Sequence, residues 1–297
     1  MDHMREPISV EIERYLRTGD ADPLYRAWPG DIIERGQRAC RELREALGSD
    51  VKRLAGGRTH ASMPTGDMVA LTRRKVTPMV NGFFPRTERD AVLAVLERSV
   101  LFVTSDNINA IILEHDSIST VWTVANLYLE SLGGPLLGDE AEPIVGLNEH
   151  MTSYVSPAYF HEDNLFADFI VHEAAHVFHN CKRRTIGLPE KRRREWLLDI
   201  AFGKRETFAY SCEAYSRILE CADGPADRRR LADEFAANVR ISDVHADSAE
   251  VASIVRDAAS MRNGWRVILA RCAPARPKGR ETTTYHLEPA AIPLPST

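Results

Sequence analysis

The chain has 297 residues, of which 44% are hydrophobic and 27% charged, and its formal net charge is −5. This balance is typical of a folded protein that buries a sizeable core, in one large domain or two small ones, and it argues against a disordered chain. The sequence has no run of eighteen apolar residues, and its first residues lack a basic region followed by an apolar one. We therefore expect a cytoplasmic protein with no membrane span, and the acidic balance argues against a nucleic-acid partner.

Cysteine usage indicates reduced thiols. The five cysteines are scattered, odd in number and free of any Cys-x-x-Cys pair. Such a pattern excludes a disulfide framework and a cysteine zinc knuckle.

The first hundred residues predict three helices separated by loops. Apolar residues recur at helical spacing in 11–17 and 31–47. Glycine and proline interrupt 56–85, which predicts loops around at most one short strand near residues 68–71. A further helix is expected from Thr87, with Thr87 as its N-cap.

The middle of the chain mixes strand and helix signals. Apolar runs at 101–104 and 110–113 fit either strands or the ends of buried helices, and periodicity leaves both open. Large apolar residues in 119–132, followed by Gly-Gly-Pro, predict a helix. Two strands are expected at 143–147 and 152–155.

Residues 169–178 read Phe-Ile-Val-His-Glu-Ala-Ala-His-Val-Phe, and His172, Glu173 and His176 are the only polar residues among them. We expect a helix over 165–180, capped by Asp163 or Asn164. Positions four apart share a helix face, so both imidazoles can reach one ion. Because the helix is apolar on most sides, it belongs in the core, where these polar groups need a partner. A metal ion supplies one.

The pattern resembles the zincin metallopeptidases, whose signature is His-Glu-x-x-His with uncharged residues between and around the ligands. The resemblance implies a zinc ion bound by His172 and His176, with Glu173 as the general base. It also implies a small sheet beside this helix, whose edge strand pairs with an extended substrate. Residues 143–159 are the candidate edge, and ordinary core strands are the alternative.

A third zinc ligand must come from elsewhere in the chain. The zincin branch with a third histidine is excluded, because Lys182 occupies the required position. The glutamate branch fits better: a second helix over 205–220 carries Glu206-Thr-Phe-Ala-Tyr210, which resembles the Glu-x-x-Ala-Asp pattern of that branch with tyrosine replacing aspartate. The resemblance implies Glu206 as third ligand, and Glu213, two turns along the same face, is the rival.

An oxyanion donor is also expected, which in this clan is usually Tyr or His. Tyr210, Tyr215, His161 and His179 are the candidates, and we name Tyr210 together with Glu173 as the catalytic pair. For His179 a supporting or surface position is favoured over a ligand role.

Basic residues crowd the segment between the two site helices. This basic cluster comprises Lys182, Arg183, Arg184, Lys191, Arg192, Arg193, Arg194, Lys204 and Arg205. Most such runs are solvated surface, and the alternative is a surface that recruits acidic segments of a substrate.

Two more helices are expected at 228–239 and 248–259, before a proline-rich extended tail at 273–297 with an optional short strand at 282–286. We therefore divide the chain into a mostly helical region at 1–100, a catalytic domain at 101–272 and the tail.

The sequence as a whole predicts a predominantly helical α+β protein, a zincin-like zinc peptidase that acts on a protein or peptide substrate. Two alternatives stay open: a zincin-like metal sensor or interaction module without peptidase activity, and a helical scaffold or nucleic-acid binder in which the motif is coincidental.

Overall fold

The computed structural model describes residues 7–59, 66–138, 141, 143–149, 151–190, 195–241 and 243–275. These residues form a predominantly helical α+β fold with one small sheet, as predicted. The α-helices are α1 (Ile8–Thr18), α2 (Ile32–Ala55), α3 (Met68–Phe83), α4 (Arg89–Ser99), α5 (Ile108–Glu114), α6 (Ile118–Ser131), α7 (Phe169–Asn180), α8 (Arg205–Cys221), α9 (Pro225–Asn238), α10 (Ser248–Ser260) and α11 (Gly264–Cys272). The strands are β1 (Val100–Phe102), β2 (Gly146–Glu149) and β3 (Thr152–Val155).

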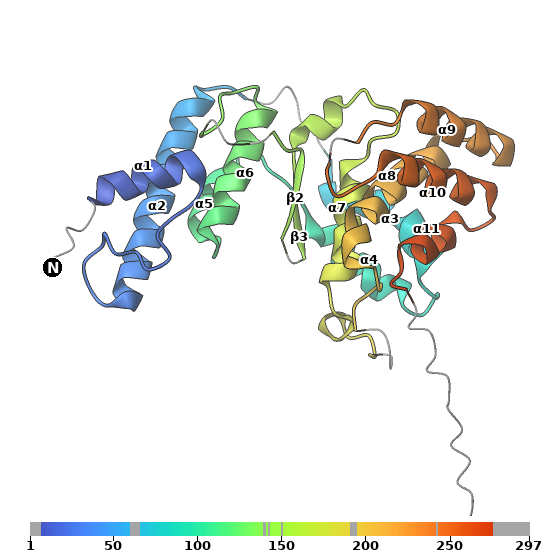
Figure 1. Cartoon of the computed structure of the whole chain (residues 1–297), viewed down its shortest axis with the longest axis horizontal. Helices are drawn as coiled ribbons and strands as arrows, with labels where there is room; N and C mark the ends of the chain where they lie inside the picture. The colour runs from blue at the N-terminus through green and yellow to red at the C-terminus, as the bar shows by residue number, and fades with distance from the viewer. Residues whose placement is uncertain are drawn as a thin grey trace, which may run out of the picture.

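Two lobes flank the sheet (Figure 1). The first lobe consists of α1, α2, α5 and α6, whose buried side chains form one hydrophobic cluster. The second lobe consists of α3, α4 and α7 to α11, and it contains the largest cluster and a smaller one beside α9 and α10. Each lobe therefore takes helices from both sides of residue 100.

Helix α2 shows why the N-terminal prediction succeeded. Asp31 accepts hydrogen bonds from Ile33 N and Glu34 N, and the Glu34 side chain completes a capping box. The helix ends at Gly56, which has a φ of 56°. It is longer than the predicted 31–47 because Val51 and Ala55 continue its buried face.

Helix α3 corrects the expectation of loops over 56–85. Asp67 caps it by accepting from Val69 N and Ala70 N, and Pro78 lies within it. Val76 and Val80 are fully buried in the second lobe. Their burial stabilises the helix despite the hydrogen bond that proline cannot donate. The strand expected near 68–71 is therefore wrong, and those residues are helical.

The start of α4 corrects two further expectations. Glu88, not Thr87, occupies the N-cap position, and its side chain makes no cap hydrogen bond. The Glu88 carboxylate instead forms an ion pair with Arg183, whose Nη2 lies 2.9 Å from Glu88 Oε1. Arg183 is fully buried, so the solvated surface expected for the basic cluster does not include it.

The apolar run at 101–104 contributes to a strand, whereas that at 110–113 forms part of α5. The helix predicted at 119–132 is confirmed as α6. The sheet has the order β1-β3-β2. Strands β1 and β3 are parallel, with Val100 opposite Ser153, whereas β2 and β3 are antiparallel, with Gly146 opposite Val155. The first predicted strand thus lies later than expected, at Gly146–Glu149, and forms one edge of the sheet.

Helix α7 carries the sequence motif and begins later than predicted. Its N-cap is Asp168, whose carboxylate accepts from Val171 N, so Asp163 and Asn164 lie outside the helix. The helices predicted at 205–220, 228–239 and 248–259 are confirmed as α8, α9 and α10, whereas α11 was not predicted. From residue 276 the proposed tail lies outside the described residues, including its optional strand at 282–286.

All five cysteines are free, as predicted, and three of them are buried. Among the described helices, none combines the length and the apolar composition needed to cross a membrane.

Candidate metal centre

Helices α7 and α8 bring three expected residues together. His172, His176 and Glu206 each offer a donor atom, and these atoms lie within 4.8 Å of one another. Glu206 Oε2 is 3.7 Å from His172 Nε2 and 3.5 Å from His176 Nε2. Two imidazole nitrogens and one carboxylate oxygen are a donor set that suits zinc and related divalent metals.

The electrostatics of this group favour a cation. Burial disfavours a charged His172, but hydrogen bonds to Glu206 and Glu213 outweigh burial and raise the pKa of His172 to about 10. Burial opposes the charge of Glu206 as well, yet the two histidines hold its pKa well below the usual range. The carboxylates that stabilise a positive charge on this buried imidazole also supply the negative charge that a bound divalent metal requires.

Glu213 lies on the other side of His172. Its Oε2 is 3.0 Å from His172 Nδ1, and its Oε1 accepts a hydrogen bond of 2.8 Å from Asp168 N. Glu206 and not Glu213 therefore faces the Nε2 atoms of both histidines. Glu213 is placed to orient the ring of His172.

Two residues that the sequence analysis missed hold the start of α7. Asp168 is fully buried and lies 3.1 Å from Lys75 Nζ of α3. Lys75 also pairs with Glu220 of α8 at 2.8 Å. The signal for Asp168 was its position just before the apolar run of the motif, a common N-cap location. Lys75 has no local signal, because only the tertiary fold brings it to α7.

Glu173 is buried against the edge strand. Its backbone oxygen accepts hydrogen bonds from Asn148 Nδ2 at 3.1 Å and from Ser153 Oγ at 3.3 Å. Its carboxylate packs on Gly146, where an added Cβ would overlap it. Burial raises the pKa of Glu173, although the two histidines oppose this shift. A glycine within a strand signals such a close approach, and this signal could have identified Gly146.

The four candidates for the oxyanion donor lie in different places. The ring of Tyr210 meets that of His172 edge-on, with centroids 4.5 Å apart. Tyr215 is buried against Trp265, and its hydroxyl accepts from Gly264 N. His161 is exposed in the short helix Pro157–His161. His179 lies beside the group of His172, His176 and Glu206 without joining it: it is 4% exposed, and its ring centroid is 5.3 Å from that of His176.

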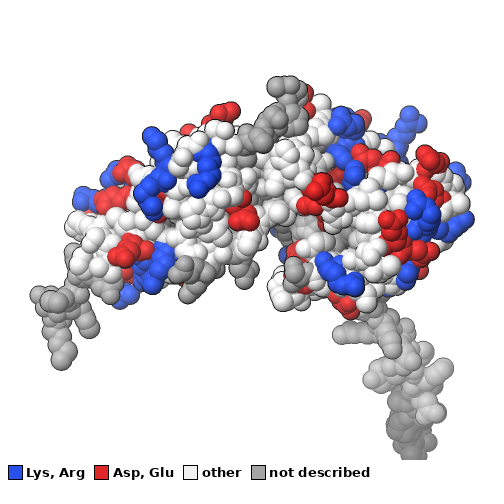
Figure 2. All heavy atoms as spheres, turned by 90° about the horizontal axis from the view of Figure 1, so that it is seen from above, with Lys and Arg blue, Asp and Glu red and all other residues white. Residues whose placement is uncertain are grey.

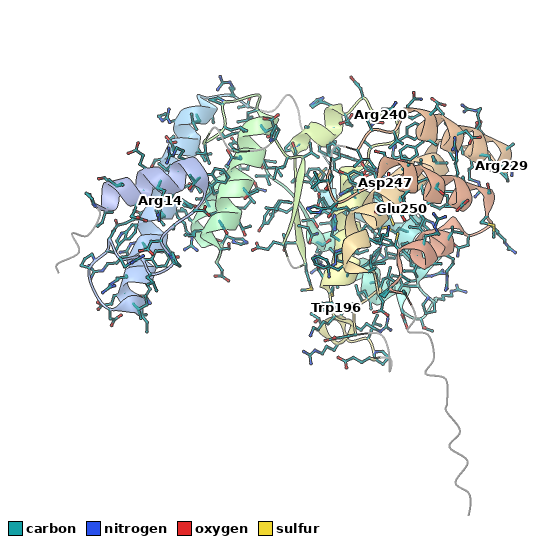
Figure 3. The ribbon with its side chains drawn as sticks, viewed as in Figure 1. Arg14, Trp196, Arg229, Arg240, Asp247 and Glu250 are labelled. Atoms are coloured by element: carbon teal, nitrogen blue, oxygen red, sulfur yellow. The ribbon has the colours of Figure 1, made fainter. Side chains whose placement is uncertain are left out.

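A cavity of about 490 Å³ adjoins the centre on the side of Tyr210 and Glu213. It lies between the segment that precedes α7, helices α8 and α9, and residues 239–241. Its apolar walls include Val145, Phe166, Phe169, Ala214, Phe235 and Ile241. Arg240 also lines it, and Figure 3 shows this residue at the upper edge of the second lobe. A cavity of this size and composition fits an apolar group of a ligand.

Among the described members of the basic cluster, all except Arg205 pair with carboxylates of the chain. Lys182 lies 2.5 Å from Glu195, Arg184 3.9 Å from Glu190, and Lys204 pairs with Glu250. On the upper face of the second lobe, Figure 2 shows Lys and Arg interspersed with Asp and Glu. The basic residues at 191–194 lie outside the described part of the chain.

Comparison with protein-family models, curated proteins and solved structures gives no match to this chain. The resemblance to zincins therefore rests on the motif, and the arrangement of its side chains is the basis for a functional proposal.

Proposed function

We propose that the protein is a zinc-dependent peptidase of the zincin type, with His172, His176 and Glu206 as zinc ligands. The observation that carries this proposal is the approach of Glu206 Oε2 to 3.7 Å and 3.5 Å from the Nε2 atoms of the two histidines. A motif match alone would not require a carboxylate from another helix at this point.

A zinc ion bound by these residues would lower the pKa of a water molecule towards ~7 and polarise a substrate carbonyl. Glu173 supplies the general base. Because burial raises its pKa above the usual value, its carboxylate holds a proton more readily than an exposed glutamate does. Glu173 takes the proton of the attacking water and passes it to the leaving amine.

Strand β2 supports a peptide as the substrate. It is an edge of the described sheet, so its outer backbone groups can pair with an extended chain. Gly146 in this strand touches Glu173, and Asn148 binds the Glu173 backbone. A peptide added along β2 would therefore run past the general base.

The test compares the wild type with Glu173→Gln, because this change removes the base and leaves all three ligands. We expect one zinc per chain in both proteins by elemental analysis. Cleavage of a peptide library, followed by mass spectrometry of new N-termini, should fall by about 10²- to 10⁴-fold in the variant.

Other outcomes would change the proposal in different ways. Zinc without any hydrolysis by the wild type would favour a metal-binding sensor or interaction module. Iron in place of zinc would favour a non-haem iron oxygenase, because such enzymes also bind their metal through two histidines and one carboxylate. Metal-free protein whose stability does not respond to zinc would overturn the proposal and favour a helical scaffold.

A further inference from the structure

Arg205 differs from the other described members of the basic cluster. Lys182, Arg183, Arg184 and Lys204 each pair with a carboxylate of this chain. Arg205 has no carboxylate partner among the described residues. Its guanidinium lies over the ring of Phe202, with the guanidinium carbon 4.8 Å from the ring centroid.

Arg205 lies next to the proposed metal centre, so the absence of a carboxylate partner there bears on what the centre can bind. It is the first residue of α8 and directly precedes the proposed ligand Glu206. Its side chain is half-buried, and its Nε atom is buried without a hydrogen-bond partner among the described atoms. Burying an unpaired donor of a charged group costs free energy, so such a donor marks a place where a partner binds.

His179 on the facing helix provides a second, independent observation. It is 4% exposed, and its Nδ1 atom also lacks a partner in the described part of the protein. The ring of His179 meets that of His176 edge-on, with centroids 5.3 Å apart. Arg205 directly precedes Glu206, whose Oε2 atom lies 3.5 Å from His176 Nε2. Two buried nitrogens without partners, Arg205 Nε and His179 Nδ1, thus lie beside the same ligands.

The chemistry of these donors selects the kind of ligand. A guanidinium binds a carboxylate through two parallel hydrogen bonds, and an imidazole that carries its proton on Nδ1 adds one more donor. A phosphate, with its larger negative charge, would be repelled more strongly than a carboxylate by the adjacent carboxylate of Glu206. A singly charged carboxylate fits better.

We propose that Arg205, with His179 beside it, forms a subsite for a substrate carboxylate next to the metal ligands. This proposal rests on the proposed peptidase function and deepens it. The substrate class is a peptide with a carboxylate close to the cleaved bond, which is either an Asp or Glu side chain or the C-terminal carboxylate of the chain.

A binding experiment tests the subsite without requiring hydrolysis. Protein loaded with Co²⁺ is titrated with the dicarboxylates from succinate to adipate and with monocarboxylates of equal length, and the visible spectrum of the cobalt is recorded. At least one dicarboxylate should bind about 10- to 100-fold more tightly than its matched monocarboxylate, the range that a charge-assisted hydrogen bond supplies. Arg205→Gln should remove this difference and retain the cobalt spectrum.

Lys204→Gln is the matched control, because it removes a neighbouring positive charge that Glu250, labelled in Figure 3, already neutralises. This control should keep the dicarboxylate preference. Equal affinity for both acids in the wild type, or an unchanged preference in Arg205→Gln, would overturn the subsite.

Peptide cleavage then distinguishes the two sources of the carboxylate. Matched peptides carry Asp or Asn near the cleaved bond, each with a free or an amidated C-terminus. An Asp side chain as the ligand predicts discrimination between Asp and Asn, whereas a C-terminal carboxylate predicts discrimination between acid and amide. Cleavage without either preference would refute the subsite and leave the peptidase standing. Dicarboxylate preference without any cleavage would refute the peptidase and leave the subsite standing.

Discussion

Glu213 binds His172 through the nitrogen that faces away from Glu206, with Oε2 3.0 Å from Nδ1. A carboxylate at one imidazole nitrogen keeps the proton on that nitrogen and fixes the ring orientation. The opposite nitrogen then presents its lone pair, which can bind a metal. The same glutamate accepts the backbone N–H of Asp168, the N-cap of α7. The orientation of His172 is therefore linked to the position at which its helix begins.

We predict that Glu206→Ala loses zinc more severely than Glu213→Ala. The first variant removes a proposed ligand, whereas the second removes only the group that orients His172, which typically costs 10- to 100-fold in metal affinity. Competition with a coloured chelator measures both dissociation constants. If Glu213→Ala loses zinc more severely, the ligand role moves to Glu213.

The sequence was sufficient to locate the candidate metal-binding histidines, because their geometry is local. His172 and His176 are one helical turn apart, and a helix over this segment follows from its apolar composition. Glu206 lies on another helix, so helical spacing alone could not identify it. Its selection also needed the resemblance of residues 206–210 to the glutamate branch of the zincins. Its approach to the two histidines depends on how α7 and α8 pack, which periodicity does not encode.

Other parts of the site could not be predicted from the sequence, because they depend on contacts between residues that are far apart along the chain. Lys75 lies on α3, in a segment whose glycines and prolines predicted loops. Buried side chains of α3 such as Met79 outweigh the helix-breaking effect of Pro78. Arg183 was misread for the same reason, because its partner Glu88 is distant in sequence.

We predict that Gly146→Ala abolishes most activity and keeps zinc. The added methyl group would overlap the carboxylate of Glu173, so the base or the edge strand must move. A misplacement of about 1 Å near reacting groups can cost roughly 10²-fold in rate. Peptide hydrolysis and zinc content measure the two effects.

Gly224→Ala is the control for that substitution, because a methyl group there meets no atom within 4 Å. It should leave hydrolysis unchanged. Full activity in Gly146→Ala would show that the contact between β2 and Glu173 does not matter for the reaction.

We predict that Lys75→Met destabilises the protein by about 3 to 5 kcal/mol at pH 7, because it leaves the buried carboxylate of Asp168 without its cation. Burial raises the pKa of Asp168, and Lys75 lowers it. Without Lys75, the pKa of folded Asp168 rises further above that of the unfolded chain. The loss should therefore shrink as the pH falls and Asp168 becomes protonated.

Denaturant unfolding at pH 7 and in mild acid measures this pH dependence. The double variant Lys75→Met/Asp168→Asn should recover much of the stability, since it removes the buried charge and keeps a capping side chain. A double variant as unstable as Lys75→Met would assign the effect to packing of the lysine stem or to the pair with Glu220.

We predict that Tyr210→Phe lowers kcat by about 10²- to 10³-fold with little change in zinc affinity, the usual cost of losing one oxyanion donor. The phenylalanine keeps the edge-on ring contact with His172, so the metal centre should persist. Steady-state kinetics and zinc content provide the comparison. An unchanged kcat would exclude the tyrosine hydroxyl as the donor and return attention to His161 and His179.

The cavity beside the centre should select the substrate side chain next to the cleaved bond. Ile241 lines this cavity, and tryptophan at this position would occupy part of its volume of about 490 Å³. We expect Ile241→Trp to raise KM at least ~10-fold for peptides with a large apolar residue, because one lost apolar contact can cost 1 to 3 kcal/mol. Peptides with alanine at that position should be cut as before.

Val244→Trp is the control, since Val244 is 90% exposed in the neighbouring segment and does not line the cavity. A uniform rise in KM for all peptides, or an equal effect in the control, would refute the assignment of the cavity to a substrate side chain.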